Sequence, residues 1–391
     1  MDRKFIQISE KVADFVRDAD ADSSSERFNS LALEVFEYQY RSIKPYRRLC
    51  QYKDRTPETV HDWSEIPAAP ADAFKHFTLF TSQPDQIAKT FRSSGTTDPR
   101  KSSQSLFSKT GVDLMNTAVA VNAARMLFPD GARTRILALA PNPEVAPHMI
   151  MVHGMNHMIE QFGAEGSRFC IGAHGFDVKA LLDELRQCEK GGAPVTLMGS
   201  SFGFVHLFDA MEEQGLRLAL PDGSRLMDAG GYKGRSRELE RAEFVQWACA
   251  LLGLPRERIV NLLGMTELAS QIYDGAIARS VQAAAGASVK TGKEPPHWVR
   301  TRIVDPTAFE SGELGEIRDV GRPGLLRHLD LANVERPMVV QSDDIGVWRE
   351  SAEGGGFEIL RRARGSEPRG CSLSVEEFNR SRSDSTSSIS R

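Results

Sequence analysis

Cysteine is scarce in this sequence, and no two cysteines form a C-x-x-C pair. The five thiols are scattered along the chain, at Cys50, Cys170, Cys188, Cys249 and Cys371. Such spacing argues against a disulfide framework and against a zinc site. We therefore expect free thiols, as in a cytoplasmic protein.

Long apolar runs and an excess of charge of one sign are missing as well. No run approaches the roughly 18 apolar residues of a membrane span, and residues 1–5, MDRKF, lack the apolar stretch of a secretory signal. The 49 basic and 53 acidic residues leave a net charge of −4, which indicates no nucleic-acid partner. These absences predict a cytoplasmic location, no membrane span and no nucleic-acid binding.

The chain is long enough for more than one hydrophobic core. Its 391 residues exceed the size at which a single core stops growing. We predict a large domain over residues 1–345, with a helical lead-in over residues 1–45, and a short C-terminal subdomain over residues 346–378. Residues 379–391 contain six serines and no core-forming pattern, so a disordered tail is predicted there.

Helical and strand patterns alternate from about residue 108 to residue 264. Helices are predicted at about 109–127, 149–162, 178–189, 204–214 and 236–252, and strands at about 135–140, 195–198, 225–227 and 259–263. Alternation with short connections predicts a doubly wound α/β sheet. Ligands of such sheets bind beyond the carboxyl ends of the strands, where Gly199–Ser201, Gly230–Gly231 and Gly264–Glu267 lie.

The pattern changes after Gly275. Short strands are predicted at about 299–304, 316–320, 337–341 and 346–348, and they suggest an antiparallel, β-rich section. The expected fold class is therefore α/β, with a β-rich section after the doubly wound sheet.

Residues 93–101, SSGTTDPRK, gather hydroxyls, a glycine and cationic side chains in one predicted loop. Backbone N–H groups, hydroxyls and the charges of arginine and lysine suit a polyphosphate. The Walker A spacing is absent, and a plain Ser/Thr-rich surface turn is the alternative. The phosphate ligands expected here are Ser93, Ser94, Gly95, Thr96, Thr97 and Lys101.

Two later segments place carboxylates at the ends of predicted strands. In the run Gly264-Met265-Thr266-Glu267, the Thr266 hydroxyl can donate to a phosphate oxygen and the Glu267 carboxylate can hold Mg²⁺. Alternatively, Thr266 caps a helix whose dipole Glu267 complements. Asp344 can accept hydrogen bonds from a ribose diol, or it is a simple β-turn acid.

In their order and spacing, these segments resemble motifs of the adenylate-forming enzymes, which include acyl-CoA ligases and nonribosomal-peptide adenylation domains. Residues 93–101 are similar to that family's phosphate loop SSGTTGxPK, and residues 264–267 to its GxTE motif. Residues 312–317, GELGEI, are similar to its segment of the same sequence. Residues 342–344 take the place of its TGD, and Arg362 that of its hinge-region arginine.

Within that family, the chain most resembles the LuxE-type acyl-protein synthetases, with phenylacetate–CoA ligases as neighbours. Residues 230–234, GGYKG, resemble a glycine-rich segment of the subfamily. Residues 364–373, RGSEPRGCSL, look like its cysteine-bearing, acyl-carrying segment. The sequence stops soon after Arg362, where ordinary ligases continue into a further domain, so we expect a truncated C-terminal subdomain.

Cys371 can be argued for from its own surroundings. A thiol is a suitable nucleophile for an activated acyl group, and neighbouring arginines, including Arg362 and Arg369, would stabilise its thiolate. The alternative is an ordinary thiol near a tail. The other four cysteines lie in or beside apolar patterns, so we expect them to be structural.

The sequence departs from the family pattern at several points. Asp98 and Asp343 replace glycines, and Leu263 replaces the aromatic residue that commonly stacks on adenine. The lysine of the ligases' last motif has no counterpart, and Lys233 is one candidate for its role.

The resemblance implies a two-step reaction. A carboxylic acid, expected to be a fatty acid, attacks the α-phosphorus of ATP and gives acyl-AMP, with Mg²⁺ on Glu267. Thr266, Glu267 and Arg362 are the expected catalytic residues of this step. Gly230, Gly231 and Gly264 would border the nucleotide, and Asp344 would fix the ribose.

In the second step Cys371 takes the acyl group and passes it to a partner, a reductase or carrier protein. Two alternatives stay open. In one, the acyl group goes directly to coenzyme A or a carrier-protein thiol while Cys371 is idle. In the other, the chain is a silent, nucleotide-binding scaffold.

Overall fold

The computed structural model describes most of the chain, as two compact units. The described residues are 2–20, 25–93, 102–172, 175–230, 239–282, 292–310, 313–349 and 356–362. The first unit contains residues up to 118, residues 265–270 and residues from 294 onward, and the second contains residues 119–264 and 271–293. The division predicted at residue 345 stays a prediction, because residues 363–391, with the expected tail, lie outside the described part.

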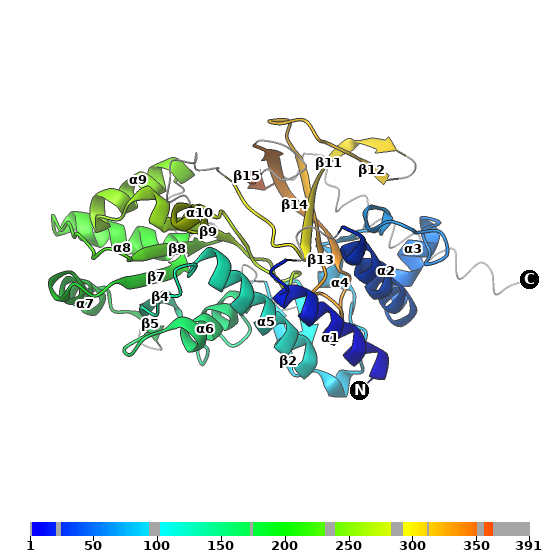
Figure 1. Ribbon diagram of the computed structural model, residues 1–391, viewed down its shortest axis with the longest axis horizontal. Coiled ribbons are helices and arrows are strands. Elements are labelled where there is room, and N and C mark those ends of the chain that lie inside the picture. The colour runs from blue at the N-terminus through cyan, green and yellow to red at the C-terminus, as the bar shows by residue number, and fades with distance from the viewer. Residues whose placement is uncertain are drawn as a thin grey trace, which may run out of the picture. The chain divides into compact units, whose positions relative to one another are not determined.

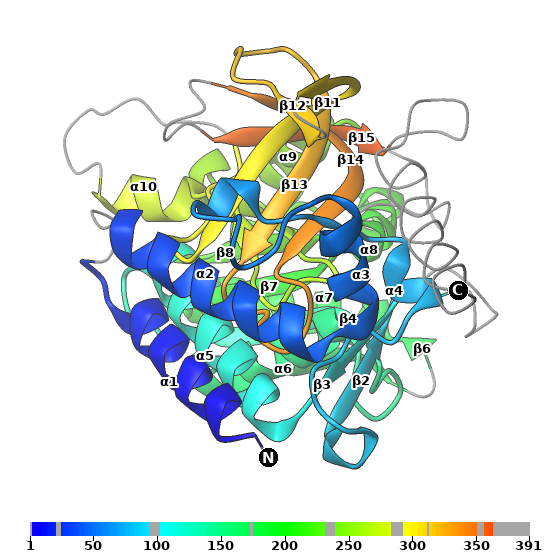
Figure 2. The same ribbon diagram turned by 90° about the vertical axis from the view of Figure 1, so that its right-hand side faces the viewer.

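Three helices open the first unit, where the sequence predicts helices over residues 1–45. They are α1 (Arg3–Arg17), α2 (Ser25–Ser42) and α3 (Lys44–Tyr52). Apolar residues at helical spacing, including Phe5, Ile8 and Val12, bury one face of α1, and the Asp2 side chain caps its start. Helices α1 and α2 lie side by side (Figures 1 and 2).

The sheet of the first unit has the strand order β1-β14-β13-β11-β12, with β15 also paired to β14. Its strands are β1 (Ala69–Pro70), β11 (Val299–Glu310), β12 (Glu313–Glu316), β13 (Gly324–Asp330), β14 (Val339–Trp348) and β15 (Phe357–Arg362). All pairs except β1–β14 are antiparallel. Figure 2 shows β11, β13 and β14 side by side in its middle, so the predicted β-rich section is confirmed.

Three details of that section differ from the sequence prediction. The strand predicted at 316–320 lies at 313–316, because a turn at Asp319–Arg322 with Gly321 at φ +78° draws the chain out of the sheet. The strands predicted at 337–341 and 346–348 are one strand, β14, whose register shifts absorb the polar residues between them. Strands β13 and β15 were not predicted.

The second unit is a doubly wound α/β sheet, as predicted. Its strand order is β10-β9-β8-β7-β4-β5-β6, and the five inner strands are parallel. The strands are β4 (Arg135–Pro141), β5 (Arg168–Gly172), β6 (Gly175–Phe176), β7 (Val195–Ser200), β8 (Arg225–Ala229), β9 (Ile259–Leu263) and β10 (Ile272–Tyr273). The helices are α5 (Lys109–Met126), which begins in the first unit, α6 (Ile150–Phe162), α7 (Val178–Gly191), α8 (Ser201–Glu213), α9 (Arg241–Leu252) and α10 (Ala276–Gln282).

One face of this sheet carries a continuous apolar core. Leu185 of α7, Phe208 of α8 and Leu251 of α9 belong to the same buried cluster as Leu197 and Leu226 of the strands. Helices α8 and α9 accordingly lie together beside β7 and β8 (Figure 1). Strands β7 and β8 are buried at every residue, on both faces, which accounts for the near-continuous apolar strands that made the sheet predictable.

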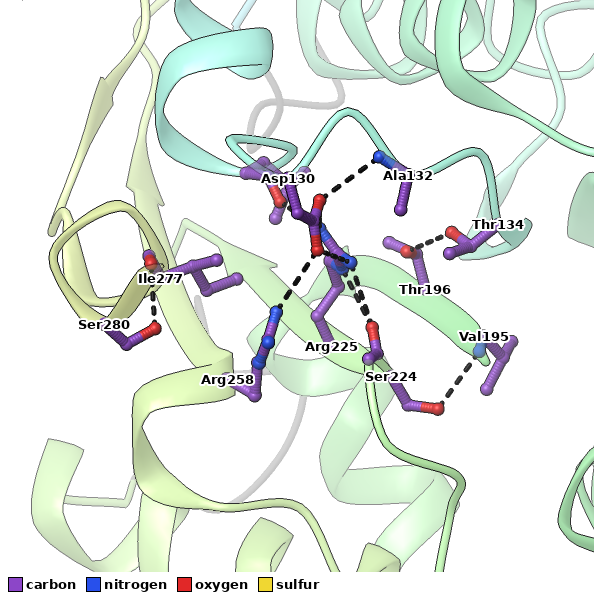
Figure 3. A network of polar contacts seen from close by, with 12 residues as sticks. Asp130, Ala132, Thr134, Val195, Thr196, Ser224, Arg225, Arg258, Ile277 and Ser280 are labelled. Atoms are coloured by element: carbon purple, nitrogen blue, oxygen red, sulfur yellow. Dashed lines mark hydrogen bonds and ion pairs between the residues drawn. The ribbon is translucent and has the colours of Figure 1, made fainter. Parts of the chain in front are cut away.

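An ion pair between a buried arginine and a more exposed aspartate anchors the amino ends of the same strands (Figure 3). Arg225, the first residue of β8, is fully buried and donates from Nη1 and Nη2 to the two carboxylate oxygens of Asp130 at 3.0 and 2.8 Å. Burial alone would raise the pKa of Asp130, but the hydrogen bonds and charge of Arg225 outweigh it and hold that pKa below its usual range. The charge of the buried Arg225 guanidinium is therefore paired by a carboxylate that lies closer to the surface.

Candidate functional site

The Ser/Thr-rich loop starts and ends on two paired strands. Strands β2 (Lys89–Arg92) and β3 (Gln104–Phe107) are antiparallel. At their ends the Ser93 N–H donates to the Ser103 carbonyl at 3.0 Å, and the Ser103 N–H donates to Ser93 Oγ at 3.0 Å. A hydroxyl can accept and donate at once, so this geometry is compatible with Ser93 as a phosphate ligand.

The rest of the expected phosphate loop lies outside the described residues. This applies to Ser94, Gly95, Thr96, Thr97 and Lys101. Their assignment stays a prediction.

The Gly-x-Thr-Glu segment forms a buried turn after β9. Thr266 and Glu267 are 8% and 7% exposed, and the Leu268 N–H donates to the Met265 carbonyl at 3.3 Å. No helix begins here, since the chain continues into β10, so the reading of Thr266 as a helix cap is wrong. A hydroxyl beside a carboxylate gives oxygen donors only, which is the set that Mg²⁺ prefers.

A buried aspartate that the sequence analysis missed holds this turn. The Asp330 carboxylate accepts hydrogen bonds from the backbone of Ala269 and Ser270, at 2.9 and 2.7 Å, and from Ser270 Oγ at 2.8 Å. It also accepts from the Ala332 N–H at 3.0 Å. Burial raises the pKa of Asp330 while the Ser270 bonds oppose that rise. Four hydrogen-bond donors surround the Asp330 carboxyl, and this arrangement fits the ionised form, which can only accept hydrogen bonds.

The main chain of Glu267 is fixed as well. Asn333 Nδ2 donates to the Glu267 carbonyl at 2.8 Å, and Asn333 Oδ1 accepts from Arg336 Nη2 at 2.7 Å. Gln39 of α2 donates to the Asn333 carbonyl at 2.6 Å. The turn is therefore held from the β13–β14 connection, which is held in its turn by the lead-in helices. These contacts span 66 and 294 residues of sequence, so no local pattern indicates them.

Asp344 lies inside β14 and is half-buried, so its reading as a β-turn acid is wrong. Its N–H donates to Ser342 Oγ at 3.1 Å. In the β14–β15 pair it stands directly opposite Arg362, the expected hinge-region arginine. The structure thus brings together two site positions that are 18 residues apart in sequence (362 − 344).

At the carboxyl ends of the second unit's strands, Asp228 forms a second polar centre that the sequence analysis missed. It is 2% exposed, and its Oδ2 accepts from Ser201 Oγ and Asn261 Nδ2, both at 2.8 Å. Its Oδ1 accepts from Arg241 Nη1 at 2.6 Å. The sequence offered one signal for this centre. Asp228 is a charged residue near the end of a strand that proves wholly buried, two residues before Gly230.

The glycines expected to border the nucleotide follow these strands. Gly230 comes directly after β8 and Gly264 directly after β9, while Gly231 lies outside the described residues. Among the residues that the structure describes, and apart from the chain neighbours of each glycine, no heavy atom lies within 4 Å of the position that a Cβ would take at Gly230 or at Gly264. That side of each glycine is therefore free of other described residues, as an approaching ligand requires.

The described cysteines behave as structural residues. Cys50, Cys170 and Cys188 are buried, and Cys249 is partly buried. Burial raises the pKa of the Cys170 thiol to about 11, which suppresses its thiolate near neutral pH. Cys371 lies outside the described residues, so its role stays a prediction. Within the described ranges, no helix combines the length and apolar character of a bilayer-crossing segment.

Comparison with known proteins identifies the family. The profile of the family described as "Acyl-protein synthetase, LuxE" matches residues 1–379. The long-chain-fatty-acid–luciferin-component ligase of Vibrio harveyi is 24% identical over 357 residues, covering 90% of this chain and 87% of that protein. The ligase of the same name from Aliivibrio fischeri is 23% identical over 356 residues, covering 89% and 87%.

Solved structures agree on the fold. A 2-hydroxyisobutyryl-CoA ligase in complex with its acyl-AMP and CoA superposes with a TM-score of 0.62 at 15% identity, covering 89% of this chain and 77% of that one. The same ligase in its postadenylation state gives a TM-score of 0.62 at 14% identity, covering 89% and 70%. The expected adenylate-forming fold is thereby confirmed. With a family profile that spans nearly the whole sequence, this chain belongs to the LuxE family of acyl-protein synthetases, which are ligases.

Proposed function

We propose that this protein uses ATP to activate a long-chain fatty acid as acyl-AMP and then carries the acyl group on Cys371 to a partner protein. Family membership supports acid activation, and the name of the Vibrio harveyi relative supports a long-chain fatty acid as substrate. The observation that carries the proposal is the buried Thr266–Glu267 turn, since an adenylation site needs its phosphate and metal ligands fixed in advance.

In the first step the fatty-acid carboxylate attacks the α-phosphorus of ATP, and the bond from that phosphorus to the bridging oxygen breaks. Acyl-AMP and pyrophosphate result. The Thr266 hydroxyl donates to a phosphate oxygen, and Asp344 accepts hydrogen bonds from the ribose hydroxyls. The fixed backbone around Glu267 leaves little to reorganise when charge develops on the phosphate.

Mg²⁺, when bound, would neutralise charge on the phosphate oxygens, with Glu267 as its protein ligand. The donor set fits, since Glu267 and Thr266 offer oxygen atoms alone. Arg362, opposite Asp344, supplies a positive charge for the same reaction.

In the second step the Cys371 thiolate attacks the acyl carbonyl of acyl-AMP, and AMP leaves as the thioester forms. A reductase or carrier protein then accepts the acyl group. The expected test is exchange of labelled pyrophosphate into ATP that depends on a fatty acid, followed by acyl labelling of the protein itself. Acyl label that persists in Cys371→Ala would refute the covalent step.

Direct transfer to coenzyme A or a carrier-protein thiol is the alternative for the second step. It predicts turnover with free coenzyme A at a rate that Cys371→Ala leaves unchanged. A scaffold without catalysis predicts ATP binding with no acid-dependent exchange. The same two assays therefore separate all three functions.

A further inference from the structure

Ser201 connects Asp228 to the glycine that follows it. The Ser201 hydroxyl lies 2.8 Å from Asp228 Oδ2 and 3.0 Å from the Gly230 carbonyl oxygen. A serine hydroxyl has one proton, so the two acceptors share it in a three-centre bond. Because Ser201 is the first residue of α8, one helix start sets the direction of the chain as it leaves β8.

Gly230 needs such a restraint. Its φ of +72° lies in the left-handed region that residues with a Cβ avoid, and the space beside it is open. No described residue beyond its chain neighbours packs against that side of Gly230, whereas the Ser201 hydroxyl holds its carbonyl. Without that bond, glycine's freedom would allow Gly230 several orientations.

Asp228 is restrained from several sides in its turn. Arg241 of α9 and Asn261 of β9 both donate to it, and Lys293 Nζ donates to Asn261 Oδ1 at 2.6 Å. Arg241 also pairs with Asp274 at 3.6 Å, and Asp274 Oδ2 accepts from the Asn261 N–H at 2.8 Å. Two cations and two carboxylates thus form one closed network around the strand ends, which fixes where Asp228 presents its oxygens.

From these contacts we infer that Ser201 and Asp228 are positioning residues for adenine-nucleotide binding, acting through Gly230. The inference rests on the proposed function, with Gly230 bordering the nucleotide as the family resemblance implies. Ser201 touches neither the nucleotide nor the acid in this account. It keeps the left-handed turn in one orientation, so that ATP meets a preformed edge of backbone.

The test uses the full-length chain with Ser201→Ala and measures the Kd for ATP, the KM for fatty acid and the melting temperature. Loss of one net hydrogen bond of about 1 kcal/mol corresponds to a roughly fivefold higher Kd for ATP. The KM for fatty acid should stay unchanged. Ser201→Thr keeps the hydroxyl and should restore the Kd to within about twofold.

Ser224→Ala is the matched control. Ser224 is also buried, and its Oγ accepts from the Val195 N–H at 3.1 Å at the opposite ends of the same strands. A purely structural role for Ser201 predicts that both alanine variants lower the melting temperature and leave the Kd for ATP alone, and that result would overturn the inference.

The readouts also separate this inference from the proposed function. Wild-type protein that binds ATP without acid-dependent exchange would refute the function, while the Kd of Ser201→Ala would still test the positioning role. Wild-type exchange together with an unchanged Kd in Ser201→Ala would refute the positioning role alone. A wild-type chain that binds no ATP would overturn both.

Discussion

Asp344 and Arg362 stand opposite each other in the antiparallel pair of β14 and β15. The register of β14 and β15 makes these two positions direct neighbours across the paired strands, so they can act as a unit. The proposed function gives one of them the ribose and the other the reacting phosphate. The pairing of β14 with β15 thus brings together the two residues, Asp344 and Arg362, whose roles the sequence suggests separately.

This pairing predicts that the two positions are energetically coupled. Asp344→Asn should raise the KM for ATP about tenfold, because a carboxylate that accepts two ribose hydroxyls is replaced by an amide. Arg362→Lys should lower kcat. The double variant should lose less than the product of the two single effects, since neighbouring residues are not additive. Multiplicative losses in a full double-mutant cycle would contradict the coupling.

Asp330 is expected to control the Thr266–Glu267 turn through its charge. Asp330→Asn replaces a hydrogen-bond acceptor with an NH₂ group that faces backbone N–H donors. The free energy of unfolding should therefore fall by about 2 kcal/mol, and the rate of pyrophosphate exchange should fall about tenfold. Urea titration and the exchange assay measure the two effects. Asp319→Asn, in an exposed ion pair, is the control that should change neither. If Asp330→Asn behaves like wild type, the carboxyl carries no charge in the folded chain.

The pair of the buried Arg225 with Asp130 should stabilise the fold without serving catalysis. Asp130→Asn leaves the Arg225 guanidinium without its carboxylate, at an expected cost of about 3 kcal/mol in unfolding free energy. Asp183→Asn, which breaks the exposed pair with Arg186, should cost less than about 1 kcal/mol. Exchange activity measured at a temperature where both variants are folded should match wild type.

The same pair carries a pH signature. The pKa of Asp130 is lowered in the folded chain, so its stabilisation is complete above the unfolded value of about 4 and is lost as the pH falls below it. Chemical denaturation of Asp130→Asn at several pH values should show that this low-pH loss is reduced. An identical low-pH loss in both proteins would show that other groups cause it.

The burial of His328 leads us to expect a second loss of stability, at a higher pH than the loss caused by Asp130. The residue is fully buried, with Nδ1 3.0 Å from Thr301 Oγ1, and burial lowers the pKa of His328 from 6.5 to about 4. The unfolded chain therefore binds the proton first, and stability falls by up to about 3 kcal/mol between pH 6.5 and pH 4. His328→Gln should flatten this interval in denaturation curves. The exposed His206→Gln should leave it unchanged.

The sequence predicts the doubly wound half of the fold well because its signals are local. The strand predicted at 259–263 has the bounds of β9, and the helix predicted at 178–189 lies in α7, which Asp177 caps by accepting from the Ala180 N–H at 2.9 Å. Runs of apolar residues and caps depend on neighbours in the chain, and a parallel sheet buried on both faces makes those runs continuous.

The β-rich half and the support of the site were harder to predict. Every residue of strand β13 is buried, yet the strand contains Arg327, His328 and Asp330. These polar residues interrupt the apolar pattern, so the sequence does not indicate a core strand there. Ser342–Asp344 resembled a turn because the partners of Ser342 and Asp344 lie on other strands, at Leu326 and Arg362. Asp330 serves a turn 60 residues away, and a contact over that distance leaves no periodic pattern.

The central claim is that this chain activates a fatty acid as acyl-AMP at the Thr266–Glu267 turn. The most direct test is exchange of labelled pyrophosphate into ATP, measured with and without long-chain fatty acids in wild type and in Glu267→Gln. We expect exchange only when a fatty acid is present, and a loss of at least about 100-fold in the variant. Exchange without acid, or full activity in Glu267→Gln, would contradict the claim.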